Sequence, residues 1–291
     1  MKLTGVLLRT LCLALLLVSM PSRASDSPRV VALSWEMVEH LLKLNITPVA
    51  VADARDYRTW VVHPRLPDSV PNAGTRTEPN LELLAQLKPD LILITPLLED
   101  IRPLLERIAP VVSYGDFTQT QDNQILQRQN FLDLAKRLGQ TGLANKQLEA
   151  MDRHLADMRR RLHQRFGAVL PKVSMVLFSS MAVVKIMGPN SMPEHAMQLL
   201  GLAPAYQVPT SRWGSVQVPI TELGAIDEGV VLYLPFAQQH RLFETQLWQG
   251  MPFVRKGHVA QMRSTWTHGG IFCVENLAAA FTDALLTLPA N

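Results

Sequence analysis

Residues 143–166 read LANKQLEAMDRHLADMRRRLHQRF, and no glycine or proline interrupts the chain between Gly142 and Gly167. Apolar side chains recur in this stretch at intervals of three to five residues: Leu143, Leu148, Met151, Leu155, Met158, Leu162 and Phe166. The spacing predicts one long amphipathic helix. At 1.5 Å per residue it spans roughly 36 Å, about the width of a small domain. A surface helix of a single domain would show the same pattern, but the mid-chain position favours a rigid spine between two lobes.

Short apolar runs and helical patterns alternate on both sides of this helix. Before it, the expected strands are residues 30–35, 48–54, 70–74, 90–95 and 110–115, and the expected helices are 36–44, 79–87, 102–109 and 121–138. After it, the expected strands are 172–180, 183–191, 229–235 and 258–262, and the expected helical segments are 192–202, 244–257 and 273–288. In the first half this alternation predicts parallel α/β packing with covered sheet faces, and the α/β pattern resumes in the second half.

The chain therefore divides into units around the long helix. We expect a signal peptide at 1–24, an N-terminal α/β lobe at 25–140, a linking backbone helix at 141–167 and a C-terminal α/β lobe at 168–291. The predicted fold class is α/β, with two α/β lobes joined by one long rigid helix. A cleft between two lobes is a preferred place for a ligand.

The first residues have the composition of an export signal. Lys2 and Arg9 form a basic region, residues 11–20 are an apolar run, and Ser22 and Ala24 supply small side chains for cleavage near Ala24. The apolar run is too short for a membrane span of about 20 residues. An N-terminal anchor helix is the alternative. Cleavage places the mature protein in the periplasm.

Cleavage also changes the charge of the chain. The full sequence has 28 Lys and Arg against 25 Asp and Glu, and three of the basic residues, Lys2, Arg9 and Arg23, lie in the leader. The mature chain then carries 25 residues of each sign. The mature chain therefore lacks the excess of positive charge by which proteins bind nucleic acids. Cys273 is the one cysteine left after cleavage, so core burial must stabilise the fold, and we expect an inert buried thiol rather than a nucleophile.

Signatures of catalysis are missing from the sequence. It contains no Gly-x-Ser-x-Gly, no phosphate-binding glycine loop, no His-Glu-x-x-His and no Cys-x-x-Cys. The eight histidines are scattered: His40, His63, His154, His163, His195, His240, His258 and His268. A zinc site built from distant histidines is the alternative to solvated or structural roles. We expect a protein that is not an enzyme, with no catalytic residue, no resident cofactor and no metal site.

Tryptophan is placed unusually in this chain. Trp60, Trp213 and Trp266 lie in predicted loops, whereas Trp35 and Trp248 lie in or beside predicted elements and are expected in the core. Each loop tryptophan could simply cover a local hydrophobic cluster. If all three line the cleft, they form an aromatic pocket for a bulky, partly apolar ligand.

Residues 74–84, GTRTEPNLELL, place an arginine before a predicted helix start at Pro79. A cation there faces the positive end of the helix dipole, at a cost on the order of 0.3–1 kcal/mol. Arg76 and the free N–H groups of that helix would together bind an anion. An ion pair with Glu78 is the alternative. Under the first interpretation, Arg76→Ala weakens ligand binding and leaves the fold as stable or slightly more stable.

Several motifs resemble one known family. In the first half these are ITPVAVADARDYRTW (46–60), LPDSV (66–70), RTEPNLELL (76–84), LKPDLILI (87–94) and RIAPVVSY (107–114); in the second half they are GPNSMPEHAMQLLG (188–201), WGS (213–215) and LWQGMPFVRKGHVAQM (247–262). Their order and spacing are similar to those of the periplasmic ferric-hydroxamate (ferrichrome-type) siderophore-binding proteins of ABC importers. The resemblance covers essentially the whole mature chain. It implies a rigid two-lobe fold that closes little, and a shallow aromatic cleft.

The resemblance also implies roles for individual residues. Arg76 would contact the iron-bound hydroxamate oxygens, while Trp60, Trp213 and Trp266 would line the pocket, with Ser215 as a further pocket residue. Two positions depart from the family pattern. The family's pocket tyrosine aligns without gaps to Leu98, and another pocket aromatic aligns to His268. Either the ligand differs from ferrichrome, or His268 supplies a replacement hydrogen-bond donor, since one lost bond changes binding by about 1–3 kcal/mol.

The family's transport role implies the partners. We expect a monomer that captures an iron(III)–siderophore, most readily of the hydroxamate type, and hands it to an inner-membrane ABC permease. Glu82 and Glu222, one in each lobe, are our candidates for docking on the permease; ordinary solvated carboxylates are the alternative. The same fold binding cobalamin or haem is the second hypothesis for function, and an exported enzyme is the third.

Overall fold

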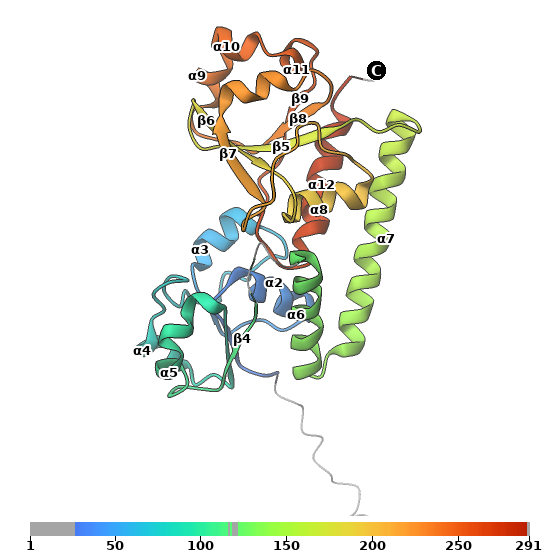
Figure 1. The fold of residues 1–291 in the computed structure, drawn as a ribbon. Helices are drawn as coiled ribbons and strands as arrows, with labels where there is room; N and C mark the ends of the chain where they lie inside the picture. Colours follow the sequence, from blue (N-terminus) through green and yellow to red (C-terminus); the bar gives the residue numbers. More distant parts are fainter. Residues whose placement is uncertain (1–26, 116, 118–121, 290–291) are drawn as a thin grey trace, which may run out of the picture.

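The protein is described by a computed structural model that places residues 27–115, 117 and 122–289. The predicted signal peptide at 1–24 lies outside the described residues. Two sheets occupy opposite ends of the molecule, and helices pack between and beside them (Figure 1). The first sheet has the order β2–β1–β3–β4 and the second the order β7–β6–β5–β8–β9. The predicted two-lobe α/β class is confirmed.

The first sheet is parallel throughout. Its strands are β1 (Val30–Ala32), β2 (Ala50–Val51), β3 (Leu91–Ile94) and β4 (Val111–Ser113). The helices of this lobe are α2 (Trp35–Lys43), α3 (Ala54–Asp56), α4 (Leu81–Leu87) and α5 (Arg102–Leu105), with a π-helical turn at Tyr57–Val61 and a 3-10 helix at Pro96–Ile101. The strand expected at 70–74 is reduced to isolated bridges at Asn72 and Gly74. Strands β1, β2 and β3 are buried throughout, as parallel packing requires, whereas the edge strand β4 is partly exposed.

The second sheet is mixed rather than parallel. Its strands are β5 (Val173–Phe178), β6 (Val183–Met187), β7 (Ser215–Pro219), β8 (Val230–Tyr233) and β9 (Val259–Gln261). Strand β6 runs antiparallel to both β5 and β7. A short turn without a crossover helix joins β5 to β6, as antiparallel neighbours allow. Strand β7 was not predicted. Short helices cover this lobe: α9 (Gln239–Phe243), α10 (Gln246–Gln249) and α11 (Pro252–Arg255), with a 3-10 helix at Ile220–Ala225.

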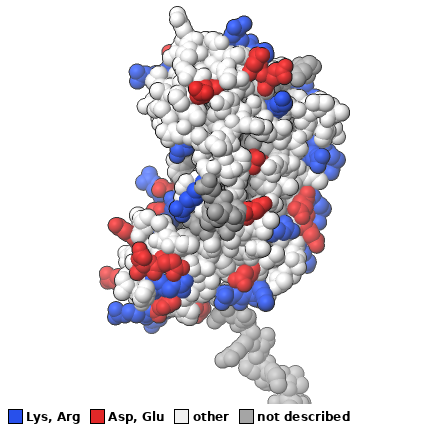
Figure 2. Space-filling model, in the orientation of Figure 1, with Lys and Arg blue, Asp and Glu red and all other residues white. Residues whose placement is uncertain are grey.

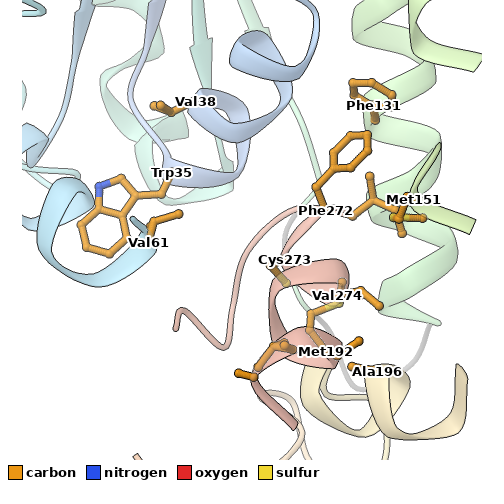
Figure 3. Packing of buried hydrophobic residues seen from close by; sticks show 14 of the residues in the cluster. Trp35, Val38, Val61, Phe131, Met151, Met192, Ala196, Phe272, Cys273 and Val274 are labelled. Carbon is orange, nitrogen blue, oxygen red and sulfur yellow. The ribbon is translucent and has the colours of Figure 1, made fainter. Parts of the chain in front are cut away.

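Four helices lie between the sheets and along one side of the molecule (Figure 1). They are α6 (Asn123–Arg137), α7 (Thr141–Phe166), α8 (Met192–Leu200) and α12 (Cys273–Leu286). Helix α7 is the predicted long helix, and its buried stripe includes Leu148, Met151 and Leu155. One hydrophobic core includes residues from these helices and from both lobes. Figure 3 shows Phe131 of α6 close to Phe272, and their ring centroids lie 4.8 Å apart.

Helix α2 of the first lobe is tied directly to the start of α12. The backbone N–H of Phe272 donates to the buried Glu39 carboxyl at 2.9 Å, and the N–H of Ile271 donates to His40 Nε2 at 3.3 Å. Lys43 adds an ion pair to Glu275 at 3.2 Å. These contacts join the two lobes in the core through backbone N–H groups of one lobe and side chains of the other.

Cys273 is buried in the core, at 2% exposed, and burial raises its pKa well above the ordinary value. The predicted burial of the thiol is therefore confirmed. In the described part of the chain, no helix combines the length and apolar composition that a membrane span requires.

Candidate functional site: an aromatic cleft between the lobes

A cavity of about 450 Å³ lies between the lobes. Its first-lobe side is built at the carboxyl ends of parallel strands: Ser34 follows β1, Asp53 follows β2 and Thr95 follows β3. Ligands of open α/β sheets bind at this edge. The full lining is Leu33, Ser34, Glu36, Asp53, Arg76, Thr77, Thr95, Leu97, Phe117, Trp213, Trp266 and His268.

Arg76 lines this cavity. Its partner in the protein is Asp53, and not the start of a helix at Pro79 or the Glu78 carboxylate, as the sequence suggested. A tight turn carries it toward β2: Gly74 adopts φ +94°, and a Cβ there would lie 2.6 Å from the Glu78 carbonyl. The Arg76 Nε donates to Asp53 Oδ2 at 3.0 Å, and its backbone N–H donates to the same oxygen at 3.1 Å. Helix α4 begins later than predicted, at Leu81, and Asn80 caps it. The predicted conflict between Arg76 and the helix dipole is therefore wrong, and so is the alternative ion pair with Glu78. Asp53 instead compensates the charge of the arginine.

The guanidinium of Arg76 lies over the ring of Trp35 and near the ring of Trp266. Its Cζ lies 3.8 Å from the centroid of the Trp35 ring and 5.7 Å from that of Trp266. Trp35 is buried, as predicted, and its Nε1 donates to the Ala52 carbonyl at 3.2 Å. Stacking on Trp35 and bonding to Asp53 leave little freedom to Arg76, so its charge is pre-positioned at the cavity wall. Sequence reasoning missed this role of Trp35.

His268 lies among aromatic rings on the second-lobe side. Its ring centroid is 5.8 Å from that of Trp266 and 5.9 Å from those of Phe117 and Trp213. Desolvation by burial, assisted by the charge of Lys185, lowers the pKa of His268 to about 4. The imidazole is therefore neutral at physiological pH. Its Nδ1 shares a hydrogen bond with the Thr267 hydroxyl at 2.9 Å, which leaves Nε2 as the other ring nitrogen able to donate or accept.

Trp213 lines the cavity and remains 44% exposed. Gly214 makes this loop possible: its φ is +61°, and a Cβ there would lie 2.5 Å from Ser191. Ser215, which we predicted in the pocket, instead begins β7 and pairs with Met187. Its N–H donates to the Ser211 hydroxyl at 2.9 Å and it is not part of the cavity lining. Ser215 is therefore not part of the cavity lining, contrary to the prediction, because its backbone pairs with β6 at the start of β7.

Trp60 does not line the same cavity as the other loop tryptophans. It belongs to the π-helical turn of the first lobe, is 51% exposed, and faces a separate depression of about 490 Å³ with Phe236 and Ser264. Ser264 is two residues from Trp266 along the chain. The two hollows therefore lie along one segment, but the predicted pocket with all three tryptophans is divided.

Leu98 is the clearest difference from the predicted pocket. It is 3% exposed and packs in the core of the first lobe, whereas its neighbour Leu97 is 60% exposed and lines the cavity. The 3-10 helix at Pro96–Ile101 turns the chain so that the earlier residue faces the cleft. The expected pocket residue Leu98 is therefore not part of the cavity lining, which contains its neighbour Leu97 instead.

Glu82 and Glu222 lie outside the cleft, one in each lobe. Both are exposed; Glu82 accepts a hydrogen bond from Gln86, and Glu222 accepts one from the Tyr206 hydroxyl at 3.2 Å. Their role in docking stays a prediction. On the face shown in Figure 2, acidic and basic side chains are intermixed over both lobes. Among the described residues, no group of three or more His, Cys, Asp or Glu side chains could hold a metal ion.

The residues that sequence reasoning missed share one signal. Ser34, Asp53 and Thr95 are polar residues that directly follow apolar strand patterns, where the carboxyl ends of parallel strands meet. A search for polar residues at the carboxyl ends of the predicted parallel strands would therefore have found all three. Phe117 and Glu36 carried no comparable signal, because their place in the cleft depends on tertiary packing.

Two sheets joined by a long helix, with an aromatic cavity at the carboxyl ends of the first sheet's strands, define a two-lobed solute-binding protein. The chain belongs to the periplasmic binding protein family, whose model matches residues 30–265. Its fold is that of the FhuD-type members of this family.

Individual relatives agree with this assignment. The chain is 33% identical over 265 residues to the iron(3+)-hydroxamate-binding protein FhuD of Escherichia coli, covering 90% of this chain and 88% of that protein. It matches the crystal structure of the siderophore-binding protein FhuD of Vibrio cholerae with bound Fe3+–Desferal at a TM-score of 0.87 and 38% identity, covering 91% of this chain and all of that one. The Fe(3+) dicitrate-binding periplasmic protein FecB of Escherichia coli is 26% identical over 262 residues, covering 86% and 82%.

Proposed function

We propose that this protein captures an iron(III)–siderophore complex of the hydroxamate type in the periplasm and delivers it to an inner-membrane ABC permease. The observation that carries the proposal is the pre-positioned Arg76 guanidinium in an aromatic cavity, in a chain similar over its length to two ferric-hydroxamate or siderophore-binding proteins. These relatives are transport proteins, and they do not favour cobalamin or haem as the ligand.

The chemistry of the cleft fits such a cargo. A ferric hydroxamate presents iron-bound oxygens, and the Arg76 guanidinium can donate charge-assisted hydrogen bonds to them. Trp213, Trp266 and Phe117 offer ring faces to the methylene chains of the ligand. The neutral imidazole of His268 can add one further donor. Because the siderophore fills the coordination sphere of iron, the protein needs no resident cofactor or metal ligand in this proposal.

The direct test is a titration of the mature protein, followed by quenching of tryptophan fluorescence. Iron(III)–Desferal should quench saturably at micromolar concentration or below, whereas cyanocobalamin and haemin, as competing chelates, should not. Iron-free Desferal controls for the ligand alone. Tight quenching by cobalamin or haemin, with none by ferric hydroxamates, would refute the proposal.

Delivery of the ligand also requires a surface on the protein that docks on the permease. In this proposal the protein acts as a monomer, and Glu82 and Glu222 contact basic pockets of the permease, one from each lobe. The variants Glu82→Arg and Glu222→Arg should then bind the ferric siderophore normally but reduce its uptake through the cognate permease. Glu149→Arg, on the exposed face of α7, is the matched control. Uptake that is equal in all three variants would remove these two residues from docking.

A further inference from the structure

The first residues of helix α2 form one corner of the cleft. Ser34 and Glu36 both line the cavity, while Trp35 between them packs under the Arg76 guanidinium. The corner is short and rigid, because β1 ends at Ala32 and α2 begins at Trp35. Its two polar side chains lie on the same cavity as Arg76 but take no part in the Arg76–Asp53 pair.

Ser34 is in an unusual state for its position. It occupies the N-cap of α2, where a serine oxygen normally accepts a hydrogen bond from an N–H of the first turn. Here the side chain makes no capping bond. Ser34 is 5% exposed, and its Oγ has no hydrogen-bond partner among the described residues. A buried hydroxyl without a partner costs free energy, so a group on a bound ligand is a natural partner for it.

The charge of the cavity lining points to the kind of group. The lining contains two carboxylates, Glu36 and Asp53, and one guanidinium, Arg76, which is bonded to Asp53 at 3.0 Å. Arg212 lies outside the lining, with its guanidinium 5.0 Å from the Trp213 ring centroid, and Lys185 is an exposed residue of β6. Among the described residues, the lining itself is therefore net negative by one charge.

The charges at the start of helix α2 add to the preference of this cavity for a positively charged group. The N–H groups at its first turn would by themselves attract an anion. Glu36 already supplies a negative charge within that turn, so a second anion placed there would be repelled. An N–H donor or a cation beside Glu36 is attracted instead, and the Phe117 and Trp213 rings of the same cavity also favour a cation.

We propose that Ser34 and Glu36 form a polar subsite that binds an ammonium or N–H group at the periphery of the ligand, and that Glu36 makes the cleft select neutral or cationic ferric complexes over anionic ones. This inference rests on the proposed function. Arg76 takes the iron-bound oxygens, and the Ser34–Glu36 corner takes the pendant group.

The test uses ligands that share one iron centre and differ in one charge. Iron(III)–Desferal carries a pendant ammonium, its N-acetyl derivative is neutral, and its N-succinyl derivative is anionic. Dissociation constants are measured by tryptophan quenching at low and high salt, for the wild type and for Glu36→Gln and Ser34→Ala. Glu149→Gln on α7 is the matched control, because it removes one carboxylate outside the cavity lining. Ratios between ligands within one variant do not depend on the fraction of folded protein.

We expect the wild type to bind in the order cationic, neutral, anionic, with differences that shrink at high salt. Glu36→Gln should reduce the ratio between the cationic and anionic ligands about five- to tenfold. Ser34→Ala should weaken the cationic ligand about two- to fivefold without lowering the melting temperature, since no capping bond is lost. Glu149→Gln should leave every ratio unchanged.

Two outcomes separate this inference from the proposed function. If all three ferric ligands bind tightly and Glu36→Gln leaves their ratios unchanged, the subsite is refuted and the proposed function stands. If none of the ferric ligands binds the wild type, the proposed function is refuted, and the subsite with it.

Discussion

Replacing Arg76 by alanine tests the centre of the site, and two separate effects are expected. The fold loses the Arg76–Asp53 ion pair, whose side chains are 36% and 20% exposed, and the stacking on Trp35 at 3.8 Å. A partly exposed pair of this kind contributes about 0.5–1 kcal/mol after solvent screening, and the cation–π contact about 0.5–1 kcal/mol. The free energy of unfolding should therefore fall by about 1–2 kcal/mol. A dipole conflict alone would have made the variant slightly more stable.

The melting temperature should then drop by about 2–8 °C, since 1 kcal/mol corresponds to about 2–4 °C for a domain of this size. Asp53 keeps the bond from the Arg76 backbone N–H at 3.1 Å, which limits the loss. Ligand binding loses charge-assisted hydrogen bonds of about 1.5–3 kcal/mol, so the Kd for iron(III)–Desferal should rise about 10- to 150-fold.

Scanning calorimetry gives the first quantity and tryptophan quenching the second. Asp53→Asn, alone and combined with Arg76→Ala, separates the two effects: the stability losses should overlap in the double variant, because both remove the same pair. A melting temperature that falls by far more than about 8 °C while the affinity of the folded protein is preserved would show that Arg76 is structural, and our interpretation of the cleft would be refuted.

Three further predictions follow from the burial of particular side chains. Leu97→Tyr should place a hydroxyl in the cleft and tighten ferric hydroxamate binding roughly three- to tenfold. Leu98→Tyr should overpack the core and cost about 1–3 kcal/mol of stability with no gain in affinity. Equal effects of the two variants, in tryptophan quenching and in melting temperature, would contradict the assignment of Leu97 to the cleft. Trp213→Ala should weaken binding about tenfold with little change in melting temperature, because the ring is 44% exposed; an unchanged Kd would exclude the ring from the site. Burial raises the pKa of Glu39 from 4.5 to about 8 and lowers that of His40 from 6.5 to about 3. Their opposite effects offset one another between about pH 4.5 and 6.5, but between about pH 6.5 and 8 only the folded protein retains the Glu39 proton, so the free energy of unfolding should fall as pH rises through that window. Urea denaturation should show this fall in the wild type and a flatter profile in Glu39→Gln; the same fall in the variant would assign it to another group.

The long helix and the first sheet could be predicted because their signals are local. An uninterrupted apolar period predicts α7, and short apolar runs between helical patterns predict β1 and β3. Strand β7 was missed because its sequence, SVQVP, is short, follows a tryptophan loop and ends in proline. It becomes a strand by pairing with β6, which is a tertiary interaction.

The candidate site was predicted in its residue types better than in its contacts. Arg76, Trp213, Trp266 and His268 do line one cavity. The pairing of Arg76 with Asp53, 23 positions away, depends on the turn at residues 74–78, and no local pattern predicts it. The comparison with the family pattern pointed to Leu98, but within the 3-10 helix at Pro96–Ile101 the preceding residue, Leu97, lines the cavity. A difference of one residue in a short helix depends on tertiary packing and not on a local pattern.

The central claim is that a ferric hydroxamate binds between the lobes against Arg76, and a crystal structure of the mature protein with iron(III)–Desferal tests it most directly. We predict iron-bound oxygens within about 3.2 Å of the Arg76 guanidinium, with the rings of Trp213 and Trp266 against the ligand and Asp53 still bonded to the arginine. Iron(III)–Desferal bound only in the depression beside Trp60, or outside the cleft altogether, would contradict the account.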